Sequence, residues 1–205
     1  MTTAVRVWRA LTPLAILAAI SANLITEIRS GDFLFLDYFG YFTNQTNLIA
    51  AGVLLVALRS TARDRPLWLE LARASAVVYL LIVVNVYWIL LWPTIDEVAH
   101  PWANAIIHAV SGVVVLIDWL LEGPRRPISL RWAWAPALYP LVWLGVVMVR
   151  GATDGWVPYP FLDPVDGYGP VVVVLVGIVA AGVLAGAAMF QLTRWRVVTP
   201  AGPPL

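Results

Sequence analysis

The run ASAVVYLLIVVNVYWILLW, residues 74–92, decides the fold class of this chain. A helix needs about 20 consecutive apolar residues to cross the hydrocarbon core of a bilayer, and this run is close to that length. It contains no charged side chain, and Asn85 is its most polar member. Comparable runs precede and follow it along the chain. The sequence therefore predicts an all-α, polytopic integral membrane protein.

Six segments are predicted to span the membrane, at residues 8–28, 41–59, 72–93, 102–121, 132–150 and 170–192. We expect them to form a single six-helix transmembrane domain over residues 1–205. The composition agrees, since 61% of the residues are hydrophobic and 12% are charged, about half the charged share of a soluble domain. A secretory signal peptide is the alternative for the first segment, but its apolar run continues to Ile28 without a convincing cleavage site.

The arginines predict the orientation of these spans, because loops on the cytoplasmic side carry an excess of Lys and Arg. The chain has no Lys, and only Arg29 and Arg150 fall on one side of the predicted bundle. The other side carries eleven: Arg6, Arg9, Arg59, Arg63, Arg65, Arg73, Arg125, Arg126, Arg131, Arg194 and Arg196. We therefore expect both termini in the cytoplasm, an even number of spans, and a location in the cytoplasmic membrane.

Composition also excludes several classes of function. The formal net charge of +1 gives no electrostatic basis for binding nucleic acid. The absence of Cys excludes disulfides and thiolate ligands, and the absence of Lys excludes a Schiff base of the kind that retinal or pyridoxal proteins use. The sequence contains no Gly-x-Ser-x-Gly, His-Glu-x-x-His, phosphate-loop or dinucleotide motif. We expect no cofactor.

His108 is the first candidate for function, because an ionisable side chain inside a span is costly. Asn104 precedes it by four residues and Ser111 follows it by three, so all three share one face of a helix. Three interpretations stay open: a buried His bonded to a neighbouring helix, a general acid or base, and a metal ligand together with His100. The chain has only two His, and Pro101 separates them, so we expect no metal.

Two more polar residues lie within predicted spans. Asn85 lies in the outer half of the third span. Asp118 lies near the cytoplasmic end of the fourth, beside Trp119, and there we expect an anchor at the level of the lipid headgroups.

The stretch YFTNQTN, residues 41–47, places five polar side chains at the start of the second span. Thr43, Thr46 and Asn47 are three and four residues apart and share a helix face. Such residues cap helices and form hydrogen bonds between helices in lipid. The functional alternative makes Thr43 a nucleophile, which requires a neighbouring base. His108 is expected at a similar depth, in the outer leaflet.

Two segments have alternative interpretations. The loop at residues 150–170 contains Trp156, Tyr159 and Phe161 among several prolines, and it is either an interfacial lid over a site or a plug at the membrane surface. Gly182 and Gly186 form a small-residue motif that lets another helix approach closely. That helix belongs either to the same chain or to a second copy in a homodimer.

Three blocks together resemble a known family: YFTNQTNLIAA (41–51), HAVSGVVVLIDWLL (108–121) and GWVPYPFLDP (155–164). They look like the bacterial Pr6Pr family of six-span membrane proteins, over about residues 8–193. That family is similar to the eukaryotic androgen-induced membrane proteins, which hydrolyse fatty-acid esters of hydroxy fatty acids within the membrane. Those enzymes use a Thr and a His, which correspond by position to Thr43 and His108. The resemblance thus implies a Thr/His hydrolase of lipid-like esters.

In such an enzyme His108 would take the proton of Thr43 as Thr43 attacks the ester carbonyl. Candidates for substrate binding, for oxyanion stabilisation or for orienting His108 are Asn44, Asn47, Asn85, Asn104, Ser111, Tyr159 and Asp163. The expected partners are membrane lipids and the ester substrate. A protein that binds or transports a small lipophilic ligand is the alternative, and a scaffold whose polar groups only join helices is a third class. A hydrolase needs Thr43 and His108 within hydrogen-bond reach, or one water apart, beside a cavity.

Overall fold

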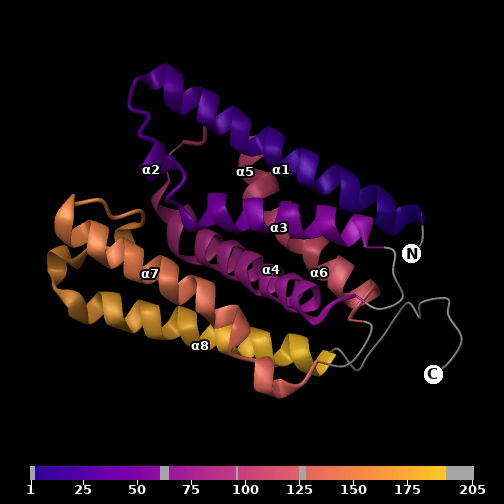
Figure 1. The fold of residues 1–205 in the computed structure, drawn as a ribbon. Helices are drawn as coiled ribbons and strands as arrows, with labels where there is room; N and C mark the ends of the chain where they lie inside the picture. The colour runs from indigo at the N-terminus through magenta and orange to yellow at the C-terminus, as the bar shows by residue number, and fades with distance from the viewer. Residues whose placement is uncertain (1–2, 61–64, 96, 125–127, 193–205) are drawn as a thin grey trace, which may run out of the picture.

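The computed structural model describes residues 3–60, 65–95, 97–124 and 128–192, and within them every regular element is a helix. Two short helices, α2 (Phe35–Tyr38) and α5 (Pro101–Ala105), accompany the longer ones. The longer helices are α1 (Thr3–Ser30), α3 (Phe42–Arg59), α4 (Leu67–Val86), α6 (Ser111–Leu121), α7 (Ala135–Thr153) and α8 (Tyr168–Leu192). Figure 1 shows them running side by side as a bundle.

Two of the predicted spans contain a π-helical turn. Helix α4 continues through the π turn η1 (Tyr87–Leu91) and the 3₁₀ turn η2 (Trp92–Thr94). Helix α5 passes through a second π turn, η3 (Ile106–Val110), into α6. A π turn inserts an extra residue into a helix, changes the direction of the side chains that follow, and often lies at a functional site. Neither turn was predicted from the residue pattern.

Five helical units are long and apolar enough to cross a membrane: Thr3–Ser30, Leu67–Thr94, Pro101–Leu121, Leu130–Thr153 and Tyr168–Gln191. This confirms the all-α class for the described residues and agrees with the expectation of a membrane-embedded helical protein. Helix α3 is not among the five, and its first turns carry the polar residues of the stretch 41–47. The sixth span and the side of the termini stay predictions, and Arg63, Arg125, Arg126, Arg194 and Arg196 lie outside the described residues.

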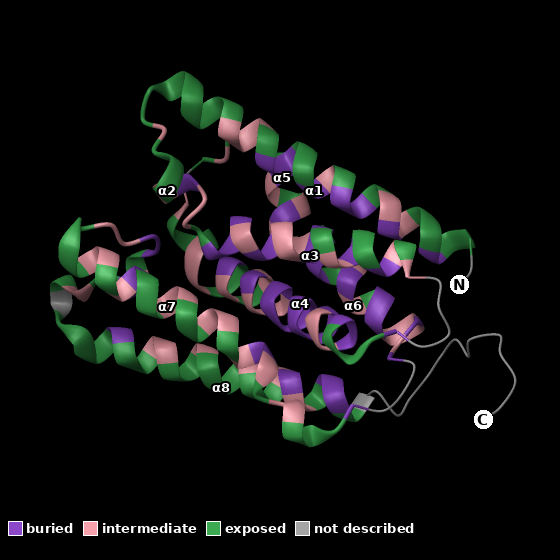
Figure 2. Cartoon of the chain, viewed as in Figure 1, coloured by how far each residue is buried: buried purple, intermediate pink, exposed green. Residues whose placement is uncertain are grey.

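Helix α4 occupies the centre of the bundle and contacts α3, α6, α7 and α8 (Figure 1). Its buried residues include Val77 and Leu80, which belong to the main apolar cluster. The outer faces of α7 and α8 are largely exposed (Figure 2). Apolar side chains make up much of that surface, and Val173 and Leu184 are 72% and 71% exposed. Continuous apolar surface of this kind is the face that a membrane helix presents to lipid.

The loop before α3 and the loop after α7 interlock. A Cβ on Gly40 would lie 2.5 Å from the indole of Trp156, so no larger residue fits there without displacing that ring. The indole N–H of Trp143 donates to the Gly40 carbonyl at 2.8 Å. Arg150 donates to Asp37 at 2.7 Å and lies over the Trp156 ring at 4.2 Å. These contacts fix the start of α3 against the end of α7.

The opposite end of the bundle holds a buried ionic cluster, which comprises Arg9, Arg65, Glu70, Arg73, Asp118 and Glu122. Asp118 accepts hydrogen bonds from Arg9 at 2.6 Å and from Arg73 at 2.8 Å. Glu70 pairs with Arg65 at 2.8 Å and with Arg73 at 2.7 Å, and Glu122 pairs with Arg9 at 2.7 Å. The cluster joins α1, α4 and the end of α6.

The ionic cluster corrects one expectation. Asp118 and Trp119 are each 2% exposed, so they are not an anchor at the headgroup level. Asp118 instead compensates buried arginines, and the Arg73 guanidinium lies 5.5 Å from the centre of the Trp119 ring. Hydropathy treats each residue as if it faced solvent or lipid, and therefore cannot find a partner on another helix.

Candidate functional site

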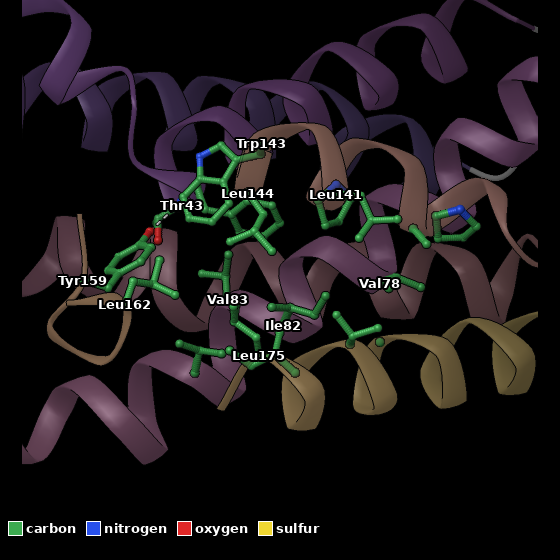
Figure 3. A pocket seen from close by; sticks show the side chains of 18 of the residues that line it. Thr43, Val78, Ile82, Val83, Leu141, Trp143, Leu144, Tyr159, Leu162 and Leu175 are labelled. Carbon is green, nitrogen blue, oxygen red and sulfur yellow. Dashed lines mark hydrogen bonds between the residues drawn. The ribbon is translucent and has the colours of Figure 1, made fainter. Parts of the chain in front are cut away.

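A partly open apolar cavity of about 100 Å³ lies between α4, α7 and α8, and the start of α3 and the loop after α7 line one end of it. Most of its lining is aliphatic, with hydroxyl groups at Thr43, Tyr87 and Tyr159. Thr43 and Tyr159 lie together at one end, with Val78 at the other (Figure 3). Ligand pockets are typically apolar with a few polar groups that fix orientation. The site therefore suits a ligand with a hydrocarbon portion and a polar group at one end.

Thr43 and Tyr159 meet although they are 116 positions apart. The Thr43 amide N–H donates to the Tyr159 hydroxyl at 3.4 Å, which brings that hydroxyl to the first turn of α3. Phe161 stacks on Tyr159 with ring centres 5.3 Å apart, and Trp143 contacts it at 6.0 Å. Burial raises the pKa of Tyr159 to about 12. The phenol therefore keeps its proton throughout the physiological range and is available as a neutral donor.

Interlocking aromatic rings hold the start of α3. Phe42 contacts the rings of Tyr79, Tyr139 and Trp143, with centres 5.1 to 6.2 Å apart. These rings come from α3, α4 and α7. Because aromatic side chains bury a large area with few rotatable bonds, they fix the position of the Thr43 backbone. Tyr139 and Trp143 were not among the predicted site residues, since nothing in their local sequence distinguishes them from membrane-interface aromatics.

His108 lies in the π turn η3, beside the cavity wall. Its ring stacks on that of Tyr87, with centres 3.7 Å apart and planes at 15°, and Tyr87 itself lines the cavity. The Nδ1 atom of His108 lies 3.2 Å from the backbone carbonyl oxygen of Asn104. A carbonyl oxygen only accepts, so Nδ1 carries the proton and Nε2 is the free acceptor of the neutral ring. The orienting group is thus the main chain of Asn104.

Asn47 joins the turn of Thr43 to the turn of His108. Its side-chain N–H₂ donates to the Thr43 carbonyl at 2.9 Å and to the Ile107 carbonyl at 3.0 Å. One nitrogen atom therefore bridges the residue proposed as nucleophile and the residue next to His108. Among the described residues no hydrogen bond joins the side chains of Thr43 and His108 directly. The Asn47 bridge thus brings the two backbone turns together.

Three buried polar atoms around the turn η3 have no hydrogen-bond partner among the described residues. They are Asn47 Oδ1, Tyr87 Oη and Ser111 Oγ. Burying an unpartnered polar atom costs about 1–3 kcal/mol, and natural sites often satisfy such atoms with water. The residues belong to three different helical segments that adjoin η3, so buried polar groups gather around this turn.

The other predicted candidates lie elsewhere. Asn44 is buried, but its side chain donates to the Tyr38 carbonyl at 2.8 Å and thereby fixes the turn before α3. Asn85 is exposed, and its side chain donates to the Leu81 carbonyl of its own helix at 2.8 Å. Asp163 is also exposed, and it accepts from the Val165 amide at 3.0 Å. None of the three lines the cavity.

Two further sequence features were candidates for function: His100 as a metal ligand, and the glycine motif of α8. The Nε2 atom of His100 lies 2.8 Å from the Thr26 hydroxyl, at the exposed end of α1. In the described residues, no group of three or more His, Asp or Glu side chains lies close enough to hold a metal ion. Gly182 lines the cavity, and Gly186 faces Pro136 and Val78 of the same chain. The bare faces of both glycines thus pack inside this chain.

No family model, curated protein or solved structure matches this chain.

Proposed function

We propose that this protein is an intramembrane hydrolase of lipid-like esters, with Thr43 as the nucleophile and His108 as the base. The observation that carries the proposal is the position of Thr43 at the polar end of an otherwise apolar cavity. The cavity lies between helices whose outer faces suit lipid. An ester with a hydrocarbon chain fits this arrangement, because its chain matches the lining and its carbonyl matches the hydroxyl groups. The resemblance to the Pr6Pr family points to the same two residues.

In the proposed mechanism Thr43 Oγ1 attacks the ester carbonyl carbon, and His108 Nε2 accepts the hydroxyl proton. The tetrahedral intermediate then collapses, the ester C–O bond breaks, and His108 returns the proton to the departing alcohol. A water molecule, deprotonated by the same nitrogen, cleaves the acyl-threonine and releases the acid. His108 is fixed for this role by the Asn104 carbonyl. The gap between the two side chains is closed by one water or by movement when substrate binds, since catalytic hydrogen bonds often tighten in the complex.

Tyr159 is the proposed donor to the developing oxyanion. Its hydroxyl lies at the Thr43 backbone, and its raised pKa keeps the proton in place. A donor prearranged at the point where negative charge develops contributes more to the transition state than to the ground state.

Covalent labelling of the purified protein tests the proposed nucleophile. We expect a lipid-like fluorophosphonate to add one mass increment, which peptide mapping assigns to Thr43. An excess of a long-chain ester should slow the labelling, because both molecules occupy the same cavity. An unlabelled protein that retains its helical circular dichroism would count against a hydrolase. It would favour the alternative, a protein that binds a lipophilic ligand without cleaving it.

Tyr159→Phe is expected to lower kcat by about 10²- to 10³-fold, the range of a single oxyanion donor, with little change in KM. The ring keeps its stacking on Phe161 and loses only the hydroxyl. Steady-state hydrolysis of a chromogenic lipid ester measures the effect. Tyr168→Phe is the matched control, since Tyr168 is exposed and lies outside the cavity. Equal kcat values for the two variants would remove Tyr159 from the mechanism.

A further inference from the structure

The cavity is a narrow channel that follows the helices rather than a round chamber. Its lining on α7 extends from Leu144 to Pro136, and its lining on α8 extends from Leu175 to Val183. Each stretch advances eight positions, which at about 1.5 Å per residue corresponds to about 12 Å. The two helices therefore give the same length independently.

The polar groups gather at one end of the channel. Thr43 and Tyr159 lie at that end, whereas Val78 lies at the other (Figure 3). The far end lies where α8 approaches α4 and α7, because a Cβ on Gly186 would be in van der Waals contact with Pro136 at 3.9 Å and with Val78 at 4.0 Å. A ligand that enters this channel must therefore place its polar group at Thr43 and the end of its hydrocarbon portion near Gly182.

We propose that the channel holds one straight acyl chain of about ten carbons and that Gly182 sets this limit. The proposal rests on the proposed function, since the ester carbonyl is assigned to Thr43. An extended residue has three backbone bonds and spans about 3.3–3.6 Å, so an extended chain advances about 1.2 Å per bond. A length of about 12 Å therefore admits about ten bonds beyond the carbonyl end. The alcohol portion of the ester stays outside the channel, in lipid.

Gly182 is the residue that determines the depth. A Cβ at this position would lie 3.3 Å from Cδ1 of Ile82, which also lines the channel. Because Gly182 has no side chain, the last part of the channel stays open beside the flexible end of the Ile82 side chain. Any larger side chain here occupies the space that the end of the acyl chain needs.

Gly182→Leu is expected to shorten the preferred acyl chain by about three carbons, the number of successive carbons that a leucine side chain adds at the channel floor. The substrates are esters of one hydroxy fatty acid with straight acyl groups shorter and longer than about ten carbons. In the wild-type protein kcat/KM should rise to about that length and then fall by at least about tenfold. Gly177→Leu is the matched control, because Gly177 is exposed on the same helix with no neighbour within 4 Å.

Native mass spectrometry of the same proteins with free fatty acids gives a second readout that needs no catalysis. Retained fatty acid should show the same chain-length limit and the same shift in Gly182→Leu. If Gly182→Leu does not fold, Gly182→Ala is used in its place, and we expect it to shift the chain-length limit by a smaller amount. An unchanged length profile in the folded Gly182 variant would overturn the proposed limit and leave the hydrolase intact. Binding with the expected limit but no hydrolysis would support the channel and reject the hydrolase.

Discussion

Thr43→Ala is expected to lower the rate of ester hydrolysis by about 10³-fold or more, because residues that act as a nucleophile–base unit lose most of their function when either is removed. His108→Gln should lower it by about 10²–10⁴-fold, the usual contribution of a positioned base. Single-turnover hydrolysis of a lipid ester, with protein in excess, measures both effects on the chemical step. The double variant should be no slower than the slower single variant, because the two residues act as one unit.

Thr43→Ser and Thr46→Ala are the controls for this experiment. Serine keeps a hydroxyl at the same position, so activity should return in part. Thr46 lies on the same helix but donates its hydroxyl proton to the Phe42 carbonyl at 2.7 Å, so its role is structural. Additive effects of Thr43→Ala and His108→Gln would show that the two side chains do not cooperate. Full activity in Thr43→Ala would exclude it as the nucleophile.

Asp118→Asn is expected to lower the free energy of unfolding by about 3–5 kcal/mol, the cost of leaving a buried charge without its partner. Asp118 accepts hydrogen bonds from Arg9, Arg73 and the indole of Trp8. An amide of the same shape keeps the packing, but it removes the negative charge that two buried guanidinium groups share. Unfolding of the purified protein in mixed micelles, followed by circular dichroism, measures the change.

Asp163→Asn is the matched control, because it makes the same chemical change at an exposed carboxylate. Asn also accepts a hydrogen bond from the Val165 amide, so we expect a change within about 0.5 kcal/mol. If Asp118→Asn were no more destabilising than this control, the ionic cluster would be hydrated rather than buried. Catalysis in folded Asp118→Asn should stay close to wild type, since the cluster lies at the other end of the bundle from Thr43.

Thr43 shows what the spacing of residues along one helix can and cannot predict. The three- and four-residue spacing of Thr43, Thr46 and Asn47 predicted that they share one face; all three are buried, but so is Asn44, which was expected to point elsewhere. The same spacing left their partners undetermined. The Asn47 bridge to Ile107 spans 60 positions and the Tyr159 contact spans 116, so neither lies within reach of a helix-periodicity argument.

His108 shows where the periodicity argument ends. The expected shared face of Asn104, His108 and Ser111 assumed a regular α-helix, whereas the π turn η3 occupies Ile106–Val110. The group that orients His108 is consequently a backbone carbonyl rather than one of the predicted side chains. Neither Gly nor Pro occurs in the turn, so no helix-breaking residue revealed it.

The sequence by itself determined the class of this protein, its helical segments and the polar residues within them. Those properties depend on the free energy of placing each segment in lipid or water, which is a sum over neighbouring residues. Only the tertiary structure decided that Asp118 compensates Arg9 and Arg73, that Gly182 lines the cavity, and that Tyr159 reaches Thr43. Those outcomes depend on packing and on pairs of charges between helices distant in sequence, and hydropathy carries no information about such pairs.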